Sequence, residues 1–425
     1  MRLGTNVAQP CSAGGDSAGE RRSVLVVGVG AGGWTGLTSA GRAAVDSAEV
    51  IVGSSRQLDL IDPRVQAERV RLPSPLAPGL PGLLERYRDR RLCVLASGDP
   101  MFYGIGSTLV RLLGPGMVEV VPNVSSVNLA CAELRWAVET VTIISAVGRP
   151  IAALQPVIQP GRRALVLTAD GNGADEVASI LRGRGFGPSR VTVLERLGAK
   201  TERTSCATAQ EWPGARHDPL AIVAIECRPG PCADLLSTAP GLPDSAYDTD
   251  GQLTKREIRA MTLSALAPLP GQLLWDVGAG TGTVGIEWMR THPDCRAVAI
   301  EPRPDRCDRI GANATALGVP GLRVISGRAP QALAGLPRPD AIFVGGAVSE
   351  AGVIDACLAA LGRGGRLVAN AVTLEAEHTL TGWCRRAGGE LTRISLCRAG
   401  ALGEFTGWRP AMPVTQWTYT EEKKP

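Results

Sequence analysis

The sequence predicts an α/β protein of two domains, each built on a mainly parallel β-sheet. Three observations lead to this prediction. The chain has 425 residues, which is more than a single hydrophobic core usually serves. Short runs rich in Val, Ile and Leu alternate with segments of helix length, a pattern typical of parallel strands buried on both faces. Residues 229–250, rich in Pro, Gly, Ser and Asp, interrupt the alternation and read as a linker before a second series begins.

The first domain is expected at residues 23–228. Its strands are predicted at 23–29, 49–53, 91–97, 117–122, 141–147, 164–169, 191–196 and 220–226, with a helix-length segment at 37–48 after the first strand. Residues 1–22 lack the apolar stretch of a secretory signal, so we expect a disordered leader there.

The second domain is expected at residues 251–425. Strands separated by helices are predicted at 272–278, 296–302, 322–327, 340–346 and 365–371, and two late strands at 389–399 and 413–420. The late strands follow each other without an intervening helix, which favours an antiparallel edge. A mostly parallel, Rossmann-like sheet of seven strands is therefore predicted.

Composition narrows the possible functions. The net charge of +4 and an aromatic content of 4% give little support to nucleic-acid binding. No apolar run approaches the roughly 20 residues that cross a bilayer. The three histidines are far apart, and the eleven cysteines form no C-x-x-C pair, so neither a metal site nor a disulfide framework is expected. A cytoplasmic protein with no nucleic-acid or membrane partner is predicted.

The first glycine-rich loop, VLVVGVGAGGWTG at 24–36, contains the dinucleotide spelling G-x-G-x-x-G at Gly28, Gly30 and Gly33. A nicotinamide site would also need an acidic residue at the end of the second strand, to bind the ribose. That strand ends in Gly53 instead. The nicotinamide alternative is therefore disfavoured, and Gly28, Gly30 and Gly32 are taken as the working glycines.

The second glycine-rich loop, WDVGAGTGTVG at 275–285, has the spacing G-x-G-x-G between a strand and a helix. An acid ends the next strand, and Gly-Arg-Ala follows the strand after that. In this order the motifs resemble the class I S-adenosylmethionine-dependent methyltransferases. The resemblance implies a cofactor site formed by Gly278, Ala279, Gly280, Thr281, Gly282, Glu301 and Ala329. The generic alternative, an ordinary Rossmann-like turn, would not require all three motifs.

Upstream of this loop, at the start of the second domain, lies DGQLTKREIRA, residues 250–260. Thr254 and Glu257 have the spacing of a capping box at a helix start. The segment also resembles the Thr-Lys-x-Glu-Ile-Arg strip of the decarboxylating methyltransferases of the cobalamin pathway, which implies that Thr254 approaches the cofactor. Arg256 and Arg259 are candidates for holding carboxylates of the substrate.

The first domain carries two further motifs. LASGDPMFYGIG at 95–106 contains Gly98 and Asp99, and VPNVSSVNLA at 121–130 contains Ser125 and Ser126. With the first loop, they resemble the class III tetrapyrrole methyltransferases, although many members have proline where this chain has Ala31. The resemblance implies a second cofactor site, formed by Gly30, Gly32, Gly98, Asp99, Ser125 and Ser126.

Together the two resemblances imply a bifunctional enzyme with one S-adenosyl-L-methionine per domain and no metal. The implied substrate is the tetrapyrrole precorrin-6Y. The first domain would methylate C5, and the second would methylate C15 and decarboxylate the C12 acetate, giving precorrin-8x. Asp99, Tyr103 and Lys255 are candidates for proton movement, with a turn carboxylate, a core aromatic and a solvated lysine as their structural alternatives. Stand-alone relatives of the C-terminal domain assemble into oligomers, so the resemblance implies a homo-oligomer.

Two other functions stay open on the sequence alone. An RNA or protein methyltransferase with an accessory domain would share the second loop. The fourth strand of that domain, however, ends in Gly345 and Gly346 and not in the Asn/Asp-Pro-Pro-aromatic motif of amino-group methylation or the Pro-Cys motif of cytosine methylation. A non-catalytic S-adenosylmethionine-binding regulator is the second alternative, and eroded cofactor motifs would be expected for it.

Overall fold

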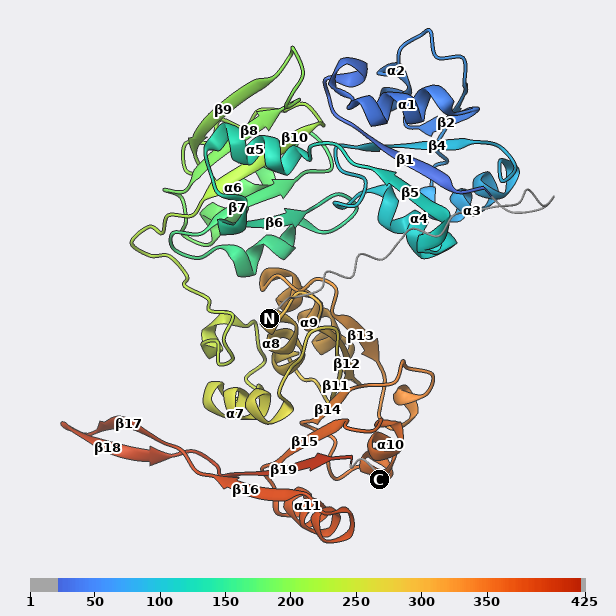
Figure 1. Cartoon of the computed structure of the whole chain (residues 1–425). Coiled ribbons are helices and arrows are strands. Elements are labelled where there is room, and N and C mark those ends of the chain that lie inside the picture. Colours follow the sequence, from blue (N-terminus) through green and yellow to red (C-terminus); the bar gives the residue numbers. More distant parts are fainter. Residues whose placement is uncertain (1–21, 422–425) are drawn as a thin grey trace, which may run out of the picture. The chain divides into compact units, whose positions relative to one another are not determined.

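The computed structural model describes residues 22–421, and the predicted leader falls almost wholly outside this range. The described chain divides into two compact units. Unit 1 contains residues up to Thr140 together with Leu194–Ser205 and Leu220–Ile222, and unit 2 contains the remainder. Figure 1 shows helices and strands alternating along the chain in both units. The predicted α/β class is confirmed.

The sheet of unit 1 is parallel and has the strand order β3-β2-β4-β1-β5. The three predicted motifs follow β1 and its neighbours β4 and β5, so they lie together at the carboxyl ends of these strands. Apolar side chains from both faces of the sheet build two core clusters around Val26 and Val27. The elements are β1 (Val24–Val29), α1 (Ser39–Ser47), β2 (Val50–Gly53), α2 (Ser55–Asp59), β3 (Glu68–Arg71), α3 (Leu76–Arg86), β4 (Leu92–Ser97), α4 (Ile105–Leu113), β5 (Val118–Val121) and α5 (Ser126–Leu134).

A second sheet follows in the chain, with the order β6-β7-β10-β8-β9. It consists of β6 (Val141–Ser145), β7 (Arg163–Leu167), β8 (Arg190–Glu195), β9 (Arg203–Thr208) and β10 (Ala221–Glu226), with α6 (Gly173–Gly183) after β7. Strands β3 and β9 are not among the predicted strands, because both are largely exposed and lack the continuous apolar runs on which the prediction rests.

The C-terminal sheet has seven strands in the order β13-β12-β11-β14-β15-β19-β16. Strand β19 runs antiparallel to both of its neighbours, so the mostly parallel seven-stranded sheet is confirmed. Its strands are β11 (Leu273–Val277), β12 (Arg296–Glu301), β13 (Arg323–Ser326), β14 (Ala341–Val344), β15 (Arg366–Ala371), β16 (Glu390–Ile394) and β19 (Val414–Thr420). Its helices are α7 (Arg256–Leu266), α8 (Thr283–Thr291), α9 (Pro304–Ala316), α10 (Val353–Ala360) and α11 (Leu374–Ala387).

The segment predicted as one strand at 389–399 is in fact divided. Strand β16 ends at Ile394, and β17 (Cys397–Leu402) then pairs only with β18 (Phe405–Pro410), in a two-stranded ribbon that extends from the sheet (Figure 1). The residues between the two strands, Ser395 and Leu396, include neither Gly nor Pro, so no turn residue in the sequence marks the break.

The predicted linker is partly integrated into the C-terminal fold. Leu242 and Tyr247 are buried in a core cluster together with Trp288 of α8. Buried Arg290 of α8 donates hydrogen bonds to the carbonyl oxygens of Leu236 and Ser237. The predicted boundaries at 228 and 251 stay predictions.

Among the described helices, none is long and apolar enough to cross a membrane.

Candidate functional sites

The three motifs of unit 1 meet at the carboxyl ends of β1 and β4. A Cβ atom on Gly28 would lie 2.0 Å from the carbonyl oxygen of Gly98 and 2.9 Å from the backbone nitrogen of Asn123. The backbone nitrogen of Gly98 donates to the Val29 carbonyl over 3.0 Å. A Cβ on Gly98 would in turn approach Ser125 Cα to 3.3 Å. Only glycine at position 28 allows this close approach of the three segments.

The glycines of the first loop have different structural roles. Gly33 has a φ of +62°, and its Cβ would lie 3.1 Å from the Leu60 side chain, so the turn itself requires it. At Gly30, by contrast, nothing lies within 4 Å of an added Cβ. Protein contacts therefore do not require glycine at position 30. A ligand that approached the backbone at the end of β1 would need such open space. At Gly32 an added Cβ would meet the Gly198 carbonyl oxygen at 3.0 Å.

Asp99 and Tyr103 lie in the loop between β4 and α4. The Asp99 carboxylate accepts a hydrogen bond from the Met101 backbone nitrogen over 2.8 Å, which is the contact of a turn carboxylate. Tyr103 has a φ of +50° and is 51% exposed, and its ring is in edge-on contact with that of Phe102, with 5.0 Å between the ring centroids. An exposed, bulky side chain in the left-handed region is uncommon away from functional sites.

Ser125 and Ser126 begin helix α5. Ser125 is buried, and its Oγ accepts from the Asn128 backbone nitrogen as the N-cap, whereas Ser126 is exposed. Asn123, which the sequence analysis missed, donates from Nδ2 to the carbonyls of Gly28 and Gly36. It therefore ties the first loop to the segment that precedes α5. Its only sequence signal is its place between Pro122 and the serine pair.

The C-terminal glycine-rich loop follows β11 and lies against the end of β14. The backbone nitrogens of Gly278 and Ala279 both donate to the Ile300 carbonyl, over 2.9 and 3.1 Å. Gly278 has a φ of +71°, and its Cβ would lie 2.9 Å from the Gly346 backbone nitrogen. The loop thus packs so closely against the segment after β14 that only glycine fits at position 278.

Glu301 is held under this loop at the end of β12. One of its oxygens accepts from the Gly280 backbone nitrogen over 2.9 Å, and the other from the Arg303 nitrogen over 3.2 Å. The residue is only 3% exposed, so its carboxylate is fixed in one orientation. This placement agrees with the predicted neighbourhood of the loop and the acid.

Three predicted cofactor residues, Gly278, Glu301 and Ala329, line one cavity of about 160 Å³ at the carboxyl edge of the sheet. The remaining lining residues are partly small or apolar and partly charged. The further lining residues are Ile300, Pro302, Arg306, Gly327, Arg328, Gly346, Ala347 and Glu350. Arg328 and Glu350 form an ion pair of 2.9 Å. Arg328 belongs to the predicted Gly-Arg-Ala motif, whereas Arg306 and Glu350 were not predicted, because charged residues after strands have no distinctive spacing.

Two buried polar atoms near the loop accept no hydrogen bond from any described residue: Oδ1 of Asp276 and Oγ1 of Thr281. The other oxygen of Asp276 accepts from the Gly285 backbone nitrogen over 2.8 Å. Burial raises the pKa of Asp276 to about 7; the Gly285 hydrogen bond opposes this shift and the nearby Glu301 charge adds to it. Asp276, although it is the acidic residue of the motif, was not among the predicted site residues.

The segment before α7 differs in part from its prediction. The helix begins at Arg256 with Lys255 as N-cap, and no side chain caps it. The predicted capping box of Thr254 and Glu257 is therefore wrong, because Glu257 forms an ion pair with Arg398 of β17 instead. Thr254 is half-buried, and Lys255 is exposed. The Gln252 carbonyl oxygen lies 3.8 Å from the position of a Cβ on Gly280, so this segment does border the loop.

Arg259 does not face a substrate. Its side chain is fully buried, and its Nε donates to Glu287 of α8 over 2.5 Å. Its Nη1 donates to Asp244 over 3.2 Å and to the Thr254 carbonyl over 2.5 Å. The proposed role of Arg259 as a carboxylate ligand for the substrate is wrong. Arg256 is exposed and stays a candidate.

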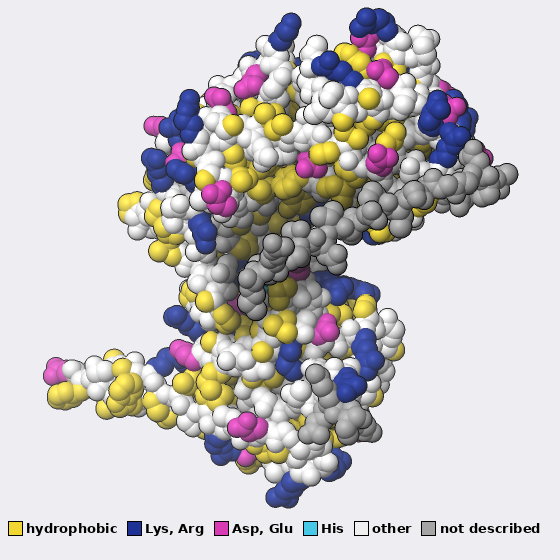
Figure 2. Space-filling view, viewed as in Figure 1, with side chains coloured by type: hydrophobic (Ala, Val, Ile, Leu, Met, Phe, Trp, Pro, Cys, Tyr) yellow, Lys and Arg dark blue, Asp and Glu magenta, His cyan; other side chains and the backbone are white. Residues whose placement is uncertain are grey.

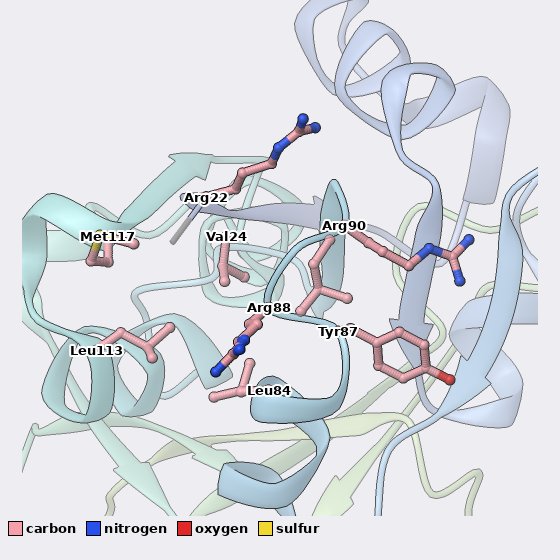
Figure 3. A pocket seen from close by; sticks show the side chains of 9 residues that line it. Arg22, Val24, Leu84, Tyr87, Arg88, Arg90, Leu113 and Met117 are labelled. Atoms are coloured by element: carbon pink, nitrogen blue, oxygen red, sulfur yellow. The ribbon is translucent and has the colours of Figure 1, made fainter. Parts of the chain in front are cut away.

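Figure 3 shows a second hollow, at the amino ends of the strands in unit 1. Apolar side chains such as Val24, Leu84 and Leu113 line it together with three arginines. Its volume of about 10 Å³ is at the lower limit for one ordered water, so it is too small for a cofactor. Within residues 22–421, no group of three or more His, Cys, Asp or Glu side chains could hold a metal ion.

Glycine-rich loops at the carboxyl ends of parallel strands, with a fixed acid beside one of them, define a two-part nucleotide-cofactor enzyme of the methyltransferase type. Family models match in the same two places: the Tetrapyrrole (Corrin/Porphyrin) Methylases at residues 23–213 and the Precorrin methyltransferase domain at residues 245–421.

Precorrin-6Y C(5,15)-methyltransferase [decarboxylating] of Sinorhizobium sp is 46% identical over 94% of this chain and 96% of its own length. The chain therefore belongs to the family of decarboxylating precorrin-6Y C(5,15)-methyltransferases. Two shorter relatives each match part of it. Cobalt-precorrin-7 C(5)-methyltransferase of Salmonella typhimurium is 33% identical over 42% of this chain and 88% of its own length. A probable cobalt-precorrin-6B C(15)-methyltransferase (decarboxylating) of Pyrobaculum aerophilum is 34% identical over 41% of this chain and 93% of its own length.

Proposed function

We propose that this chain uses S-adenosyl-L-methionine to methylate precorrin-6Y at C5 and C15 and removes the C12 acetate carboxyl as carbon dioxide, giving precorrin-8x in cobalamin biosynthesis. The observation that carries the proposal is the C-terminal cavity, in which Gly278, Glu301 and Ala329 converge from three different strand ends. The family of the full-length relative supports the same reaction.

The C-terminal cavity fits the methyl donor chemically. The fixed carboxylate of Glu301 can accept from ribose hydroxyls, and the backbone at Gly280 leaves space that a Cβ would fill. Near the loop, Oδ1 of Asp276 and Oγ1 of Thr281 are buried without a hydrogen-bond partner among the described residues, although neither residue lines the cavity. Gly327 and Ala329 are proposed to border the adenine. When bound, the donor supplies a methyl group on a positively charged sulfur.

In the N-terminal domain we propose a second donor site, formed by Gly30, Gly32, Gly98, Asp99, Ser125 and Ser126. Supporting this, the three segments that carry these residues approach each other closely, and open space lies next to Gly30. One donor per domain and no metal are part of the proposal.

The chain's own residues mainly position the reactants and exclude water. A reduced tetrapyrrole has nucleophilic, enamine-like carbons, so the enzyme needs to align such a carbon with the methyl group and to desolvate both. Loss of carbon dioxide leaves an electron pair, which the conjugated macrocycle can accept. Asp99 and Tyr103 in the first domain, and Lys255 in the second, are proposed to move protons. Arg256 is proposed to bind a substrate carboxylate.

We also propose that residues 23–228 form the C5 domain and residues 251–425 the C15 and decarboxylation domain, with 229–250 between them. The two shorter relatives, named for C(5) and C(15) methylation, each match a length of chain close to one of these domains. The enzyme is proposed to act in the cytoplasm, with a small-molecule substrate and no nucleic-acid or membrane partner.

Mass spectrometry tests the reaction directly. After incubation of the protein with precorrin-6Y and S-adenosylmethionine, we expect a product that has gained two methyl groups and lost one carbon dioxide. Heat-inactivated protein is the control. A product with methyl groups but no loss of carbon dioxide, or an unchanged substrate, would contradict the proposal.

Self-association is proposed through the ribbon of β17 and β18, with a second copy of the chain as its occupant. Leu402, Phe405 and Trp408 of the ribbon are 66, 78 and 75% exposed, and Met412 beyond it is 72% exposed; Figure 2 shows this apolar surface. A lone two-stranded ribbon is marginally stable in water. Side chains of this size cover roughly 600 Å² together, close to the ~800 Å² per partner of a standard interface.

We expect light scattering to give the wild-type protein a mass of at least twice the 44.3 kDa of one chain. A Phe405→Glu/Trp408→Glu variant should run as a monomer, because two charges would have to be buried in the interface. Leu112→Glu, an apolar-to-charged change at another exposed position, should leave the mass unchanged. A monomeric wild type would refute this part of the proposal.

A further inference from the structure

Residues 241–255, here called the strap, run from the predicted linker to the start of α7 and are held by buried polar side chains. Glu287 of α8 is 2% exposed. It accepts hydrogen bonds from the backbone nitrogens of Gly241 and Leu242, over 2.6 and 3.0 Å, and from the Tyr247 hydroxyl over 2.8 Å. Glu287 also forms an ion pair with Arg259, which donates a hydrogen bond to the carbonyl of Thr254 near the end of the strap.

The middle of the strap is held by Asn313 of α9, which is only 3% exposed. Its Oδ1 accepts from the Asp248 backbone nitrogen over 2.9 Å, and its Nδ2 donates to the Asp248 carbonyl over 2.9 Å. The same Nδ2 also donates to the Thr281 carbonyl over 3.3 Å. One amide thus links the strap to the glycine-rich loop, although it does not line the cavity.

The strap in turn borders the cavity. Arg306, which lines the cavity, donates to Asp250 over 2.9 Å and to the Gln252 side chain over 2.7 Å. The Gln252 carbonyl lies against Gly280. A shift of the strap would therefore displace the Arg306 side chain and change the shape of the cavity beside the glycine-rich loop.

From these contacts we infer that Asn313 is a positioning residue for methyl transfer in the C-terminal domain: it fixes the strap against the glycine-rich loop so that the donor site has one shape. The inference rests on the proposed function, because it requires that the cavity binds the methyl donor. Asn313 acts through Asp248 and Thr281 and makes no contact with the donor itself. The Arg259–Glu287 pair holds the two ends of the strap in the same way.

Asn313→Asp is the sharpest test, because it keeps the shape and the accepting oxygen but replaces the donating NH₂ by a second acceptor. The carbonyls of Asp248 and Thr281 would then face an oxygen. In calorimetric titration with S-adenosylhomocysteine, the wild type should show two sites per chain. We expect Asn313→Asp to bind S-adenosylhomocysteine about tenfold more weakly at the C-terminal site and with wild-type affinity at the N-terminal site. The C-terminal site is identified as the one that a Gly278→Val variant lacks.

Kinetics separates positioning from simple stability. In C15 methylation the variant's KM for the donor should rise about tenfold, with a smaller change in kcat, and C5 methylation serves as the internal control. Asp248→Asn is the matched variant: it removes the ion pair of 3.4 Å with Arg309, but the Asn313 bonds go to the backbone of residue 248 and are kept. It should behave like the wild type.

Because a buried carboxylate could prevent folding, Asn313→Ala is measured as well, and thermal unfolding is recorded for every variant. Folded Asn313→Asp or Asn313→Ala protein with wild-type affinity and KM at the C-terminal site would overturn the inference, even if its melting temperature were lower. Absence of C-terminal binding in the wild type would instead refute the proposed donor site.

Discussion

A Gly278→Val variant is expected to lose C15 methylation and decarboxylation by at least a hundredfold and to bind one S-adenosylhomocysteine per chain where the wild type binds two. Gly278 has a φ of +71°, and its Cβ would lie 2.9 Å from the nitrogen and 3.1 Å from the Cα of Gly346. A β-branched residue is strained in this conformation, and its side chain would separate the loop from the end of β14. Product analysis and calorimetry measure the two effects.

Gly311→Ala is the matched control, because it also adds a Cβ to a glycine of the same domain. Nothing lies within 4 Å of an added Cβ at Gly311, which is in helix α9. This variant should keep both donor sites and both activities. If Gly278→Val retained C15 methylation at the wild-type rate, the cavity beside the loop would not be the donor site.

The second large effect concerns pH and Asp276. Burial raises the pKa of this carboxyl from its ordinary 3.8 to about 7 in the folded protein. Between these values the folded state keeps a proton that the unfolded state has lost. Asp276 thus contributes stability that is fully present below about pH 4 and is lost as the pH rises to about 7. At about 1.4 kcal/mol per pH unit, the loss over the full window is roughly 4 kcal/mol.

Asp276→Asn should remove this dependence, because the amide cannot ionise and its oxygen can still accept from the Gly285 nitrogen. We expect the free energy of unfolding in urea to fall more steeply between pH 5 and pH 7 for the wild type than for the variant. Groups such as Asp250, whose pKa is lowered by its hydrogen bond with Arg306, are common to both proteins and cancel in the difference. Parallel pH profiles would show that Asp276 is ionised in the folded protein throughout.

The sequence predicted best what short stretches encode. The loop at Gly278–Gly282 and the acid Glu301 are within some twenty residues of each other, and adjacent parallel strands must bring them together. The mainly parallel order of the C-terminal sheet followed from strands separated by helices. The nicotinamide alternative could be disfavoured from the sequence because the second strand ends in Gly53, with no acid to bind the ribose. The structure adds that Gly33 supports a turn against Leu60.

Contacts between distant segments were not predictable in the same way. Asn313 is 65 residues from Asp248, and Glu287 is 46 residues from Gly241. No local spacing in the sequence therefore indicates that these pairs are hydrogen-bonded. The capping box failed because Glu257 found a partner 141 residues away, Arg398. Arg259 was misassigned because an arginine near a site looks the same in sequence whether it is exposed or buried.

The strap also determines where the two halves of this protein can be separated. A fragment that began at residue 251 would lack the Leu242 and Tyr247 side chains that complete the core around Trp288. It would also leave Glu287 buried without its partners at Gly241, Leu242 and Tyr247. The part of the chain that folds with the C-terminal sheet therefore starts upstream of Leu236, where Arg290 first holds the backbone. A change in the length of the connection after that point would therefore break contacts of the C-terminal core.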